Sequence, residues 1–259
     1  MARGTGGILV TGGGSFLGDY IARALLAEGI PVSLLAPPGA EDRLGQLARQ
    51  ARWSPADVWS PGSLRGKARG HEAVIHTIGS LIDDPARGAS YEQLNLVSAR
   101  NVANMCISDG VARLIFISGA RAPWLKRGYI QSKRAAESYL RRSGLRTIIV
   151  RAPVLYTRDQ DRTLFFRLAT RLGGLPPMAW MGLGNAAPMA VEALARGVAQ
   201  LALTGTYDNS IVYAEDLRRL ARRARVHPEK ASPGAQYSGF ADAPDEDLPF
   251  GWTPGDEQP

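Results

Sequence analysis

Cysteine is nearly absent from this chain of 259 residues, which contains only Cys106. A single thiol excludes an internal disulfide framework and a cluster of thiolate metal ligands. Cys106 lies in an apolar helical pattern, which is typical of an inert buried thiol. Strand-like residues begin as early as Ile8, so we expect no signal or transit peptide in this sequence, with a segment removed during maturation as the alternative.

Positive charge is absent from the end of the chain. Residues 231–259 hold six acidic side chains and no Lys or Arg, whereas the whole chain carries a formal net charge of +7. The preceding residues therefore carry +13. Such a basic body favours an anionic partner, for example lipid headgroups or an acidic protein. Aromatic residues do not interleave with the basic ones, so we expect no nucleic-acid partner.

Charge of either sign is absent from residues 172–191. Glycines and prolines recur throughout this stretch, so it cannot form a regular membrane-spanning helix. We expect this stretch to form part of the buried core of a substrate-binding subdomain. An apolar lid over a pocket and a loop that touches a membrane are the alternatives.

From His227 the chain is rich in Pro, Gly, Ser and acidic residues, so it should lack a hydrophobic core. Apolar side chains nevertheless recur along residues 231–259, as in a segment that docks on a partner. These are Tyr237, Phe240, Leu248, Phe250 and Trp252. We therefore expect a disordered or partner-docked tail, with a tail that has no function as the alternative.

The most informative stretch is rich in glycine and covers residues 6–18. The apolar run at residues 8–10 predicts a buried strand. Apolar residues at helical spacing from Leu17 predict a helix that ends at Gly29. Strand, glycine turn and helix together favour a dinucleotide site, with the pyrophosphate at the helix N-terminus. A tight turn without a ligand is the alternative.

This glycine motif departs from its usual form at one position. In a G-x-G-x-x-G motif that starts at Gly13, Ser15 occupies the place of the middle glycine. That glycine normally lets the backbone approach the pyrophosphate. The Ser15 side chain could crowd the phosphate, or its hydroxyl could bond to it.

Strand-like and helix-like segments then alternate along the chain. The expected strands are residues 31–35, a strand that ends at 56–59, 73–79, 113–118, 147–153 and 210–213. The expected helices are 44–52, one capped by Ser63, 91–109, 164–172, 192–203 and 215–225. This alternation predicts an α/β protein with a doubly wound parallel sheet, a Rossmann fold. The expected parts are a dinucleotide-binding core at 1–158 completed by helix 191–204, a small C-terminal substrate-type subdomain at 159–226, and the tail at 227–259.

The second expected strand leaves the type of dinucleotide open. Its end usually carries an acid that binds the ribose of NAD, or has an Arg nearby for the 2′-phosphate of NADP. Here residues 36–38 are Ala-Pro-Pro, and Arg43 follows two acids slightly later. We therefore expect NADP or NAD.

His76 lies in the fourth expected strand, near its end, and is a candidate metal ligand by residue type. No second His or acid lies at the spacing of a metal site, so we interpret His76 as a packed histidine and expect no metal.

Tyr129 and Lys133 lie four residues apart, so they share one face of an expected helix. A nearby ammonium favours the phenolate and should lower the pKa of the tyrosine toward neutrality. Tyr129 would then be a proton donor or acceptor for a carbonyl or an alcohol. A routine surface helix is the alternative.

Four arginines form a basic face on the last expected helix. They are Arg218, Arg219, Arg222 and Arg223. This face could bind anionic lipid or an acidic subunit, and a solvated surface is the alternative.

Together these features resemble the short-chain dehydrogenase/reductase superfamily, in its extended and atypical branches. The resemblance covers residues 7–219. It rests on residues 11–18, Asp57, residues 74–76, Asn95, residues 116–118, Tyr129 with Lys133, and Arg151 with Pro153. Residues 128–134 look most like the mitochondrial coenzyme Q biosynthesis accessory proteins. The chain is also similar to the nucleotide-binding accessory subunit of respiratory complex I.

The resemblance implies a set of site residues. Gly12, Gly13, Ser15 and Gly18 would surround the pyrophosphate, Asp57 would reach the adenine, and Lys133 would bind the nicotinamide ribose and tune Tyr129, the acid/base. Further cofactor contacts would come from Phe16, Leu17, Arg43, Val58, Thr77, Ile78, Gly79, Asn95 and Pro153. Ser118 is the candidate catalytic serine, although the family's usual serine position aligns better with Ala120.

The residues lead to two functional hypotheses. The first is an accessory protein that binds the dinucleotide, has weak or no turnover, and belongs to a membrane-associated respiratory or quinone-related assembly. We expect such a protein on the cytoplasmic or mitochondrial-matrix side of the membrane, peripherally attached. The alternative is an active oxidoreductase that uses Tyr129 and Lys133 on an apolar carbonyl, alcohol or quinone-related substrate.

Overall fold

The core of the protein is a parallel β-sheet, seen in a computed structural model that describes residues 6–123, 125–157 and 187–224. Seven strands are ordered β3-β2-β1-β4-β5-β6-β9, and every neighbouring pair is parallel. The strands are β1 (Ile8–Thr11), β2 (Val32–Ala36), β3 (Arg52–Pro55), β4 (Ala73–His76), β5 (Arg113–Gly119), β6 (Arg146–Ala152) and β9 (Ser210–Val212). This confirms the predicted doubly wound α/β sheet.

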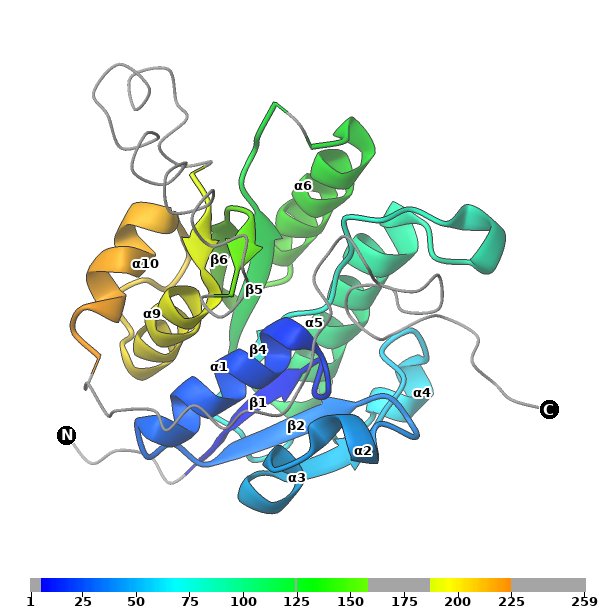
Figure 1. Cartoon of the computed structure of the whole chain (residues 1–259). Helices are drawn as coiled ribbons and strands as arrows, with labels where there is room; N and C mark the ends of the chain where they lie inside the picture. The colour runs from blue at the N-terminus through cyan, green and yellow to red at the C-terminus, as the bar shows by residue number, and fades with distance from the viewer. Residues whose placement is uncertain (1–5, 124, 158–186, 225–259) are drawn as a thin grey trace.

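Helices cover both faces of the sheet (Figure 1). The larger ones are α1 (Phe16–Ala27), α5 (Ser98–Asp109), α6 (Arg127–Arg142), α9 (Val191–Leu203) and α10 (Ala214–Ala221). Shorter elements are α2 (Glu41–Leu44), α3 (Leu47–Gln50), α4 (Pro61–Leu64), the 3-10 helix η1 (Pro85–Arg87), the π-helix η2 (Glu92–Val97), and a small sheet of β7 (Leu155–Tyr156) with β8 (Met189–Ala190).

The alternation of side chains along β5 shows how the two faces are filled. Ile115 and Ile117 pack in one buried apolar cluster with α1, α9 and α10. Leu114 and Phe116 point the other way and pack with α5 and α6. Successive strand residues face opposite sides of a sheet, so a strand buried on both faces is apolar throughout.

The strand order reverses between β1 and β4. Val10 of β1 pairs with Leu34 of β2 on one side and with Ile75 of β4 on the other. In doubly wound sheets, ligands bind outside the carboxyl ends of the strands at such a switch point. The glycine turn that follows β1 therefore lies where the sheet topology places a ligand.

Several local predictions were wrong. The expected helix 44–52 is two short helices and the start of β3, because Gly45 adopts a positive φ of 51° between α2 and α3. Ser63 does not cap α4; Ser60 is at the cap position, and the Ser63 hydroxyl accepts the Asp57 N–H. The last helix, α10, ends at Ala221 rather than at residue 225.

Other expectations were confirmed or lie outside the described residues. Gly110 ends α5 in the left-handed conformation, with φ of 77°. Cys106 is buried, and burial raises the pKa of its thiol to about 12. The expected helix 164–172, most of the uncharged stretch 172–191 and the tail 227–259 lie outside the described ranges. No helix within those ranges has the length and apolar character needed to cross a membrane.

Candidate active site

The turn between β1 and α1 is built from residues whose backbone conformation or close packing requires glycine. Gly12 and Gly14 have positive φ angles of 89° and 75°, which favour glycine. A Cβ at Gly18 would collide with the Gly12 carbonyl oxygen, so α1 can approach the end of β1 this closely only without a side chain there. The first-turn N–H groups of such a helix are the groups that bind phosphate in dinucleotide sites.

Ser15, which replaces the usual middle glycine, is the N-cap of α1. Its hydroxyl donates to the Gly12 carbonyl oxygen at 2.5 Å and accepts the Gly18 N–H at 3.4 Å. Ser15 is buried. The hydroxyl therefore bonds within the turn, and Ser15 stabilises the start of the helix as serine caps do.

Asp19 is a further residue of this turn that sequence reasoning missed. Its carboxylate accepts the Gly14 N–H at 2.8 Å, and the side chain is buried. An acid in the first turn of a helix is a common stabilising feature and was the available signal. Asp19 thus fixes the positive-φ residue at the apex of the turn.

A cavity of about 240 Å³ extends from this turn to helix α6. Its lining is mainly apolar, with a few polar groups. The lining residues are Phe16, Leu17, Thr77, Gly79, Ser80, Leu81, Ile117, Ser118, Gly119, Leu125, Tyr129, Lys133, Ala152, Pro153, Val154 and Leu155. Glycine turn, helix N-terminus and adjoining cavity together fit the binding of a dinucleotide.

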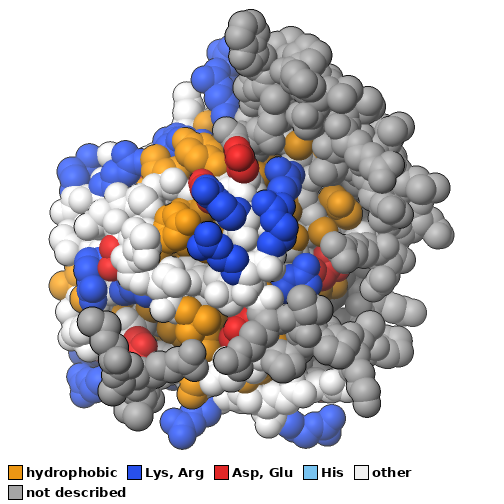
Figure 2. Space-filling model, turned by 90° about the vertical axis from the view of Figure 1, so that its left-hand side faces the viewer, with side chains coloured by type: hydrophobic (Ala, Val, Ile, Leu, Met, Phe, Trp, Pro, Cys, Tyr) orange, Lys and Arg blue, Asp and Glu red, His pale blue; other side chains and the backbone are white. Residues whose placement is uncertain are grey.

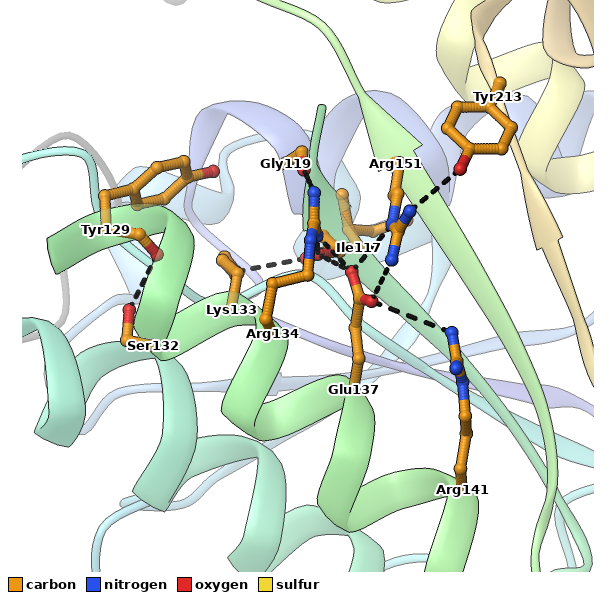
Figure 3. Close-up of polar contacts among 11 residues, drawn as sticks. Ile117, Gly119, Tyr129, Ser132, Lys133, Arg134, Glu137, Arg141, Arg151 and Tyr213 are labelled. Atoms are coloured by element: carbon orange, nitrogen blue, oxygen red, sulfur yellow. Dashed lines mark hydrogen bonds and ion pairs between the residues drawn. The ribbon is translucent and has the colours of Figure 1, made fainter. Parts of the chain in front are cut away.

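Tyr129 projects from α6 toward the end of β5 (Figure 3). A Cβ at Gly119 would lie 2.5 Å from the phenolic oxygen, so the glycine makes room for it. The Tyr91 ring packs edge-on against the Tyr129 ring, with centroids 6.2 Å apart. Burial raises the pKa of Tyr129, although Arg134 opposes this. The prediction that Lys133 lowers this pKa toward neutrality was wrong, because desolvation outweighs the effect of Arg134.

Lys133 lies one helical turn further along α6 and is also buried. Its ammonium donates to the Ile117 carbonyl oxygen at 3.1 Å and lies 4.9 Å from the centre of the Phe116 ring. Burial lowers the pKa of Lys133 to about 7, against the attraction of Glu137. A Cβ at Gly79 would collide with the Lys133 nitrogen, so the loop after β4 closes directly over this group.

Ser118 lines the cavity, but its hydroxyl is used elsewhere. It donates to Glu137 at 2.7 Å and accepts from Arg134 at 3.2 Å. Glu137 also binds Arg151 through both carboxylate oxygens (Figure 3). The hydroxyl proton of Ser118 is therefore committed to a buried ionic cluster, and this does not support the expected catalytic role. At the alternative position, Ala120 has only a methyl group.

Asn95 and His76 support the loop after β4 and the neighbouring strand. The Asn95 side chain accepts the Ser80 N–H at 3.2 Å and donates to Ser132 at 3.1 Å. His76 bonds to the Thr11 hydroxyl at 2.8 Å and is fully buried, and burial lowers its pKa to about 3. This confirms His76 as a packed histidine. Within the described ranges, no group of three or more His, Cys, Asp or Glu side chains could hold a metal ion.

Comparison with protein families gives a direct match to this region. Residues 12–174 match a family described as NAD(P)H-binding. The chain belongs to this NAD(P)H-binding family. NAD or NADP is therefore its cofactor, as expected. The resemblance to the coenzyme Q accessory proteins and to the complex I subunit stays a prediction.

Two relatives of this NAD(P)H-binding protein are reductases. A ceramide reductase from Caulobacter vibrioides is 32% identical over 183 residues, which is 69% of this chain and 55% of that protein. A 2-alkyl-3-oxoalkanoate reductase from Stenotrophomonas maltophilia is 28% identical over 120 residues, 43% of this chain and 32% of that protein. The chain thus spans about half of the first relative's length and a third of the second's.

Solved structures share the fold of this NAD(P)H-binding protein. A dTDP-glucose 4,6-dehydratase from Streptomyces venezuelae, solved with NAD bound, has a TM-score of 0.56 at 23% identity, covering 79% of this chain and 74% of its own. A UDP-glucose 4-epimerase from Thermotoga maritima has a TM-score of 0.58 at 19% identity, with 84% and 82% covered. At these sequence identities the similarity shows a shared fold alone.

Some predicted cofactor contacts of this NAD(P)H-binding protein lie outside the cavity lining. Val58 and Ile78 are buried in the cluster under α5 and α6, so their side chains pack in the core. The Asp57 carboxylate accepts the Trp59 N–H at 2.9 Å. Arg43 is exposed, and its Cβ would lie 3.3 Å from a Cβ added at Gly14. Gly12, Gly13, Ser15, Gly18 and Asn95 are also absent from the cavity lining. The cofactor roles of all the residues named in the sequence analysis stay predictions.

Proposed function

We propose that this protein is an NAD(P)-dependent oxidoreductase that reduces an uncharged, largely apolar carbonyl compound. One observation carries the proposal: Tyr129 and Lys133 project from one face of α6 into the apolar cavity that begins at the glycine turn. This cavity brings a candidate proton donor next to the place where the family fold holds a dinucleotide.

The state of Tyr129 suits reduction. Because burial raises the pKa of Tyr129, the phenol keeps its proton at neutral pH. It is therefore the protonated group available to a carbonyl oxygen in the cavity, although the raised pKa makes it a weaker acid. Lys133 lies on the same helix face and is the candidate to bind the ribose next to the reacting ring. A bound NADH or NADPH supplies the hydride.

The lining of the cavity supports an apolar substrate. Leu81, Leu125 and Leu155 contribute to its wall, and Lys133 is its one ionisable side chain besides the Tyr129 phenol among the described lining residues. A charged substrate would find no ion-pair partner in these walls except Lys133. The related ceramide reductase is named after a lipid, which agrees with a largely apolar substrate.

The test is the turnover of NADPH with a panel of aryl and medium-chain ketones. We expect Tyr129→Phe to lower turnover by about 10²- to 10⁴-fold, with nucleotide affinity retained. Tyr139→Phe is the matched control, because Tyr139 lies on the same helix and its hydroxyl bonds to Asn104. Equal turnover by both variants would contradict the role of Tyr129.

A second candidate function is an accessory protein with little turnover. Neither candidate position for the catalytic serine offers a free hydroxyl, which favours the accessory function. The Ser118 hydroxyl donates to Glu137, and Ala120 carries only a methyl group, so an oxyanion on the substrate lacks a hydrogen-bond donor there. Loss of one such donor typically raises a barrier by about 2.7–4 kcal/mol. An accessory protein would bind NADPH tightly, and even its wild type would turn over none of the ketones.

The accessory function also needs a surface for its assembly. Figure 2 shows Lys and Arg side chains gathered on the side of the molecule that carries α9 and α10. Arg219, Arg222 and Arg223 are exposed there. Arg218, expected on this face, instead turns inward and donates to the carbonyl oxygens of residues 187 and 188. Flotation with anionic liposomes tests this surface, and a protein that stays at the bottom of the gradient would contradict lipid binding.

A further inference from the structure

A second hollow, of about 350 Å³, lies beside α6, outside the cavity described above. Its walls come from α6 and β6, and the two cavities share no lining residue. The residues are Arg134, Glu137, Ser138, Arg141, Arg142 and Arg151. Figure 3 shows Arg134, Glu137 and Arg141 along α6, with Arg151 facing them from the neighbouring strand.

The hollow is strongly basic. Four guanidinium groups line it together with one carboxylate. Both oxygens of Glu137 are already engaged: Ser118 and Arg134 bind one, and Arg151 binds both. Glu137 therefore neutralises Arg134 and Arg151, which form the floor of the hollow. Its carboxylate has little hydrogen-bonding capacity left for Arg141 and Arg142, which form the rim.

The rim arginines keep donors available. Arg141 comes within 3.9 Å of Glu137 only through one nitrogen, and its side chain is 51% exposed. Arg142 donates from one nitrogen to the Ser138 hydroxyl at 2.7 Å and forms no ion pair with a described residue. Both arginines line the hollow, and each guanidinium with unused N–H groups is a planar donor fork of the kind that phosphate oxygens accept.

We propose that this hollow is a binding site for a phosphate monoester dianion, with Arg141 and Arg142 as its direct ligands. Arg134 and Arg151 are held by Glu137 at the floor and contribute positive potential. The volume suits a phosphate group with a few attached carbon atoms. A phosphorylated metabolite and a phosphatidic acid headgroup present the same chemistry.

The test is calorimetric titration of glycerol 3-phosphate into the full chain, with saturating NADPH present so that the probe cannot occupy the dinucleotide site. We expect saturable binding that weakens about ten-fold or more in Arg141→Ala/Arg142→Ala, since each lost charge-assisted contact is worth about that factor. Arg65→Ala/Arg69→Ala is the matched control: it removes the same charge at two exposed positions elsewhere and should bind like wild type.

A second arm separates the two sources of the ligand. Vesicles of phosphatidylcholine with phosphatidic acid are compared with phosphatidylcholine alone, using the same variants. Binding to the phosphatidic acid vesicles but not to phosphatidylcholine alone, lost in Arg141→Ala/Arg142→Ala, identifies a lipid headgroup. Glycerol 3-phosphate binding without vesicle binding identifies a soluble ligand. Thermal melting confirms that the variants are folded. No binding in either arm, or equal weakening in both double variants, would overturn the proposal.

Discussion

The glycine turn leads into the start of α1, where Phe16 and Leu17 line one end of the cavity, and helix α6 lines the other end. The two ends are built in opposite ways. At the turn, side chains are withdrawn from the cavity: Ser15 and Asp19 bond to the backbone of the turn itself. At α6, side chains form the surface, because Tyr129 and Lys133 project into the cavity. One end presents backbone to a ligand, and the other presents ionisable groups.

The difference determines what each end depends on. The turn depends on backbone conformation, and its hydrogen bonds are short-range contacts within residues 12–19. The α6 end depends on buried charge, which is stable only where a counter-ion compensates its desolvation. Glu137 provides this for Arg134 and Arg151, whereas among the described residues Lys133 has only a carbonyl oxygen and an aromatic ring as direct polar and cation–π contacts.

The largest effect should follow from removing the shared counter-ion. We expect Glu137→Gln to lower the free energy of unfolding by about 3 kcal/mol, the lower end for breaking a buried pair, because Arg134 and Arg151 lose their partner. Denaturant unfolding measures this. Glu92→Gln, at an exposed position of η2, is the control and should leave stability unchanged. Equal stability of both variants would show that the ionic cluster does not hold α6 to β6.

A smaller effect should appear in the pH dependence of stability. The pKa of Lys133 is lowered to about 7 in the folded protein, so between pH 7 and its ordinary value of 10.5 the unfolded chain binds more protons. Stability should therefore rise as pH rises from 7 to 9, by at most about 1.4 kcal/mol for each pH unit. The buried Cys106 opposes this rise as pH approaches 9, because the unfolded thiol then begins to lose its proton while the buried thiol keeps it, so the rise is clearest between pH 7 and 8.

The matched pair for this measurement is Lys133→Met and Lys126→Met. The first should remove the rise between pH 7 and 9, because the buried amine is gone. The second changes an exposed lysine at the start of α6 and should keep it. A wild-type protein whose stability is flat over this range would show that Lys133 is ordinarily charged in the folded state.

The smallest effect is expected at the turn. Ser15→Ala should lower stability by about 1 kcal/mol, the usual effect of losing an N-cap, with little change in NADPH affinity. Ser60→Ala is the control, since Ser60 caps α4 without a side-chain hydrogen bond. A large loss of NADPH affinity with intact stability would instead mean that the Ser15 hydroxyl binds the phosphate.

The same contrast explains what the sequence could predict. The turn was recognisable because its requirements are local: positive φ at Gly12 and a bare Cα at Gly18 appear directly as glycines. The strands were recognisable because a parallel sheet buried on both faces needs continuous apolar runs. Tyr129 and Lys133 were paired correctly because helical spacing alone places them on one face.

The polar network at α6 could not be predicted in this way. Ser118 and Glu137 lie 19 residues apart, and Arg151 lies 14 residues beyond Glu137. Their contact depends on how β5, α6 and β6 pack, which no local pattern encodes. The direction of the Tyr129 pKa shift likewise depends on burial, so charge spacing predicted the wrong sign. Arg218 turned inward for a similar reason, to reach carbonyl oxygens before β8.

The most direct test of the proposed oxidoreductase is isotope transfer. NADPH that carries deuterium at the transferable position is incubated with the ketone panel, and the products are analysed by mass spectrometry. We predict that one deuterium enters the alcohol product with the wild-type protein and that Tyr129→Phe strongly reduces its yield. Tight binding of NADPH without deuterium in any product would contradict the oxidoreductase and leave the accessory function.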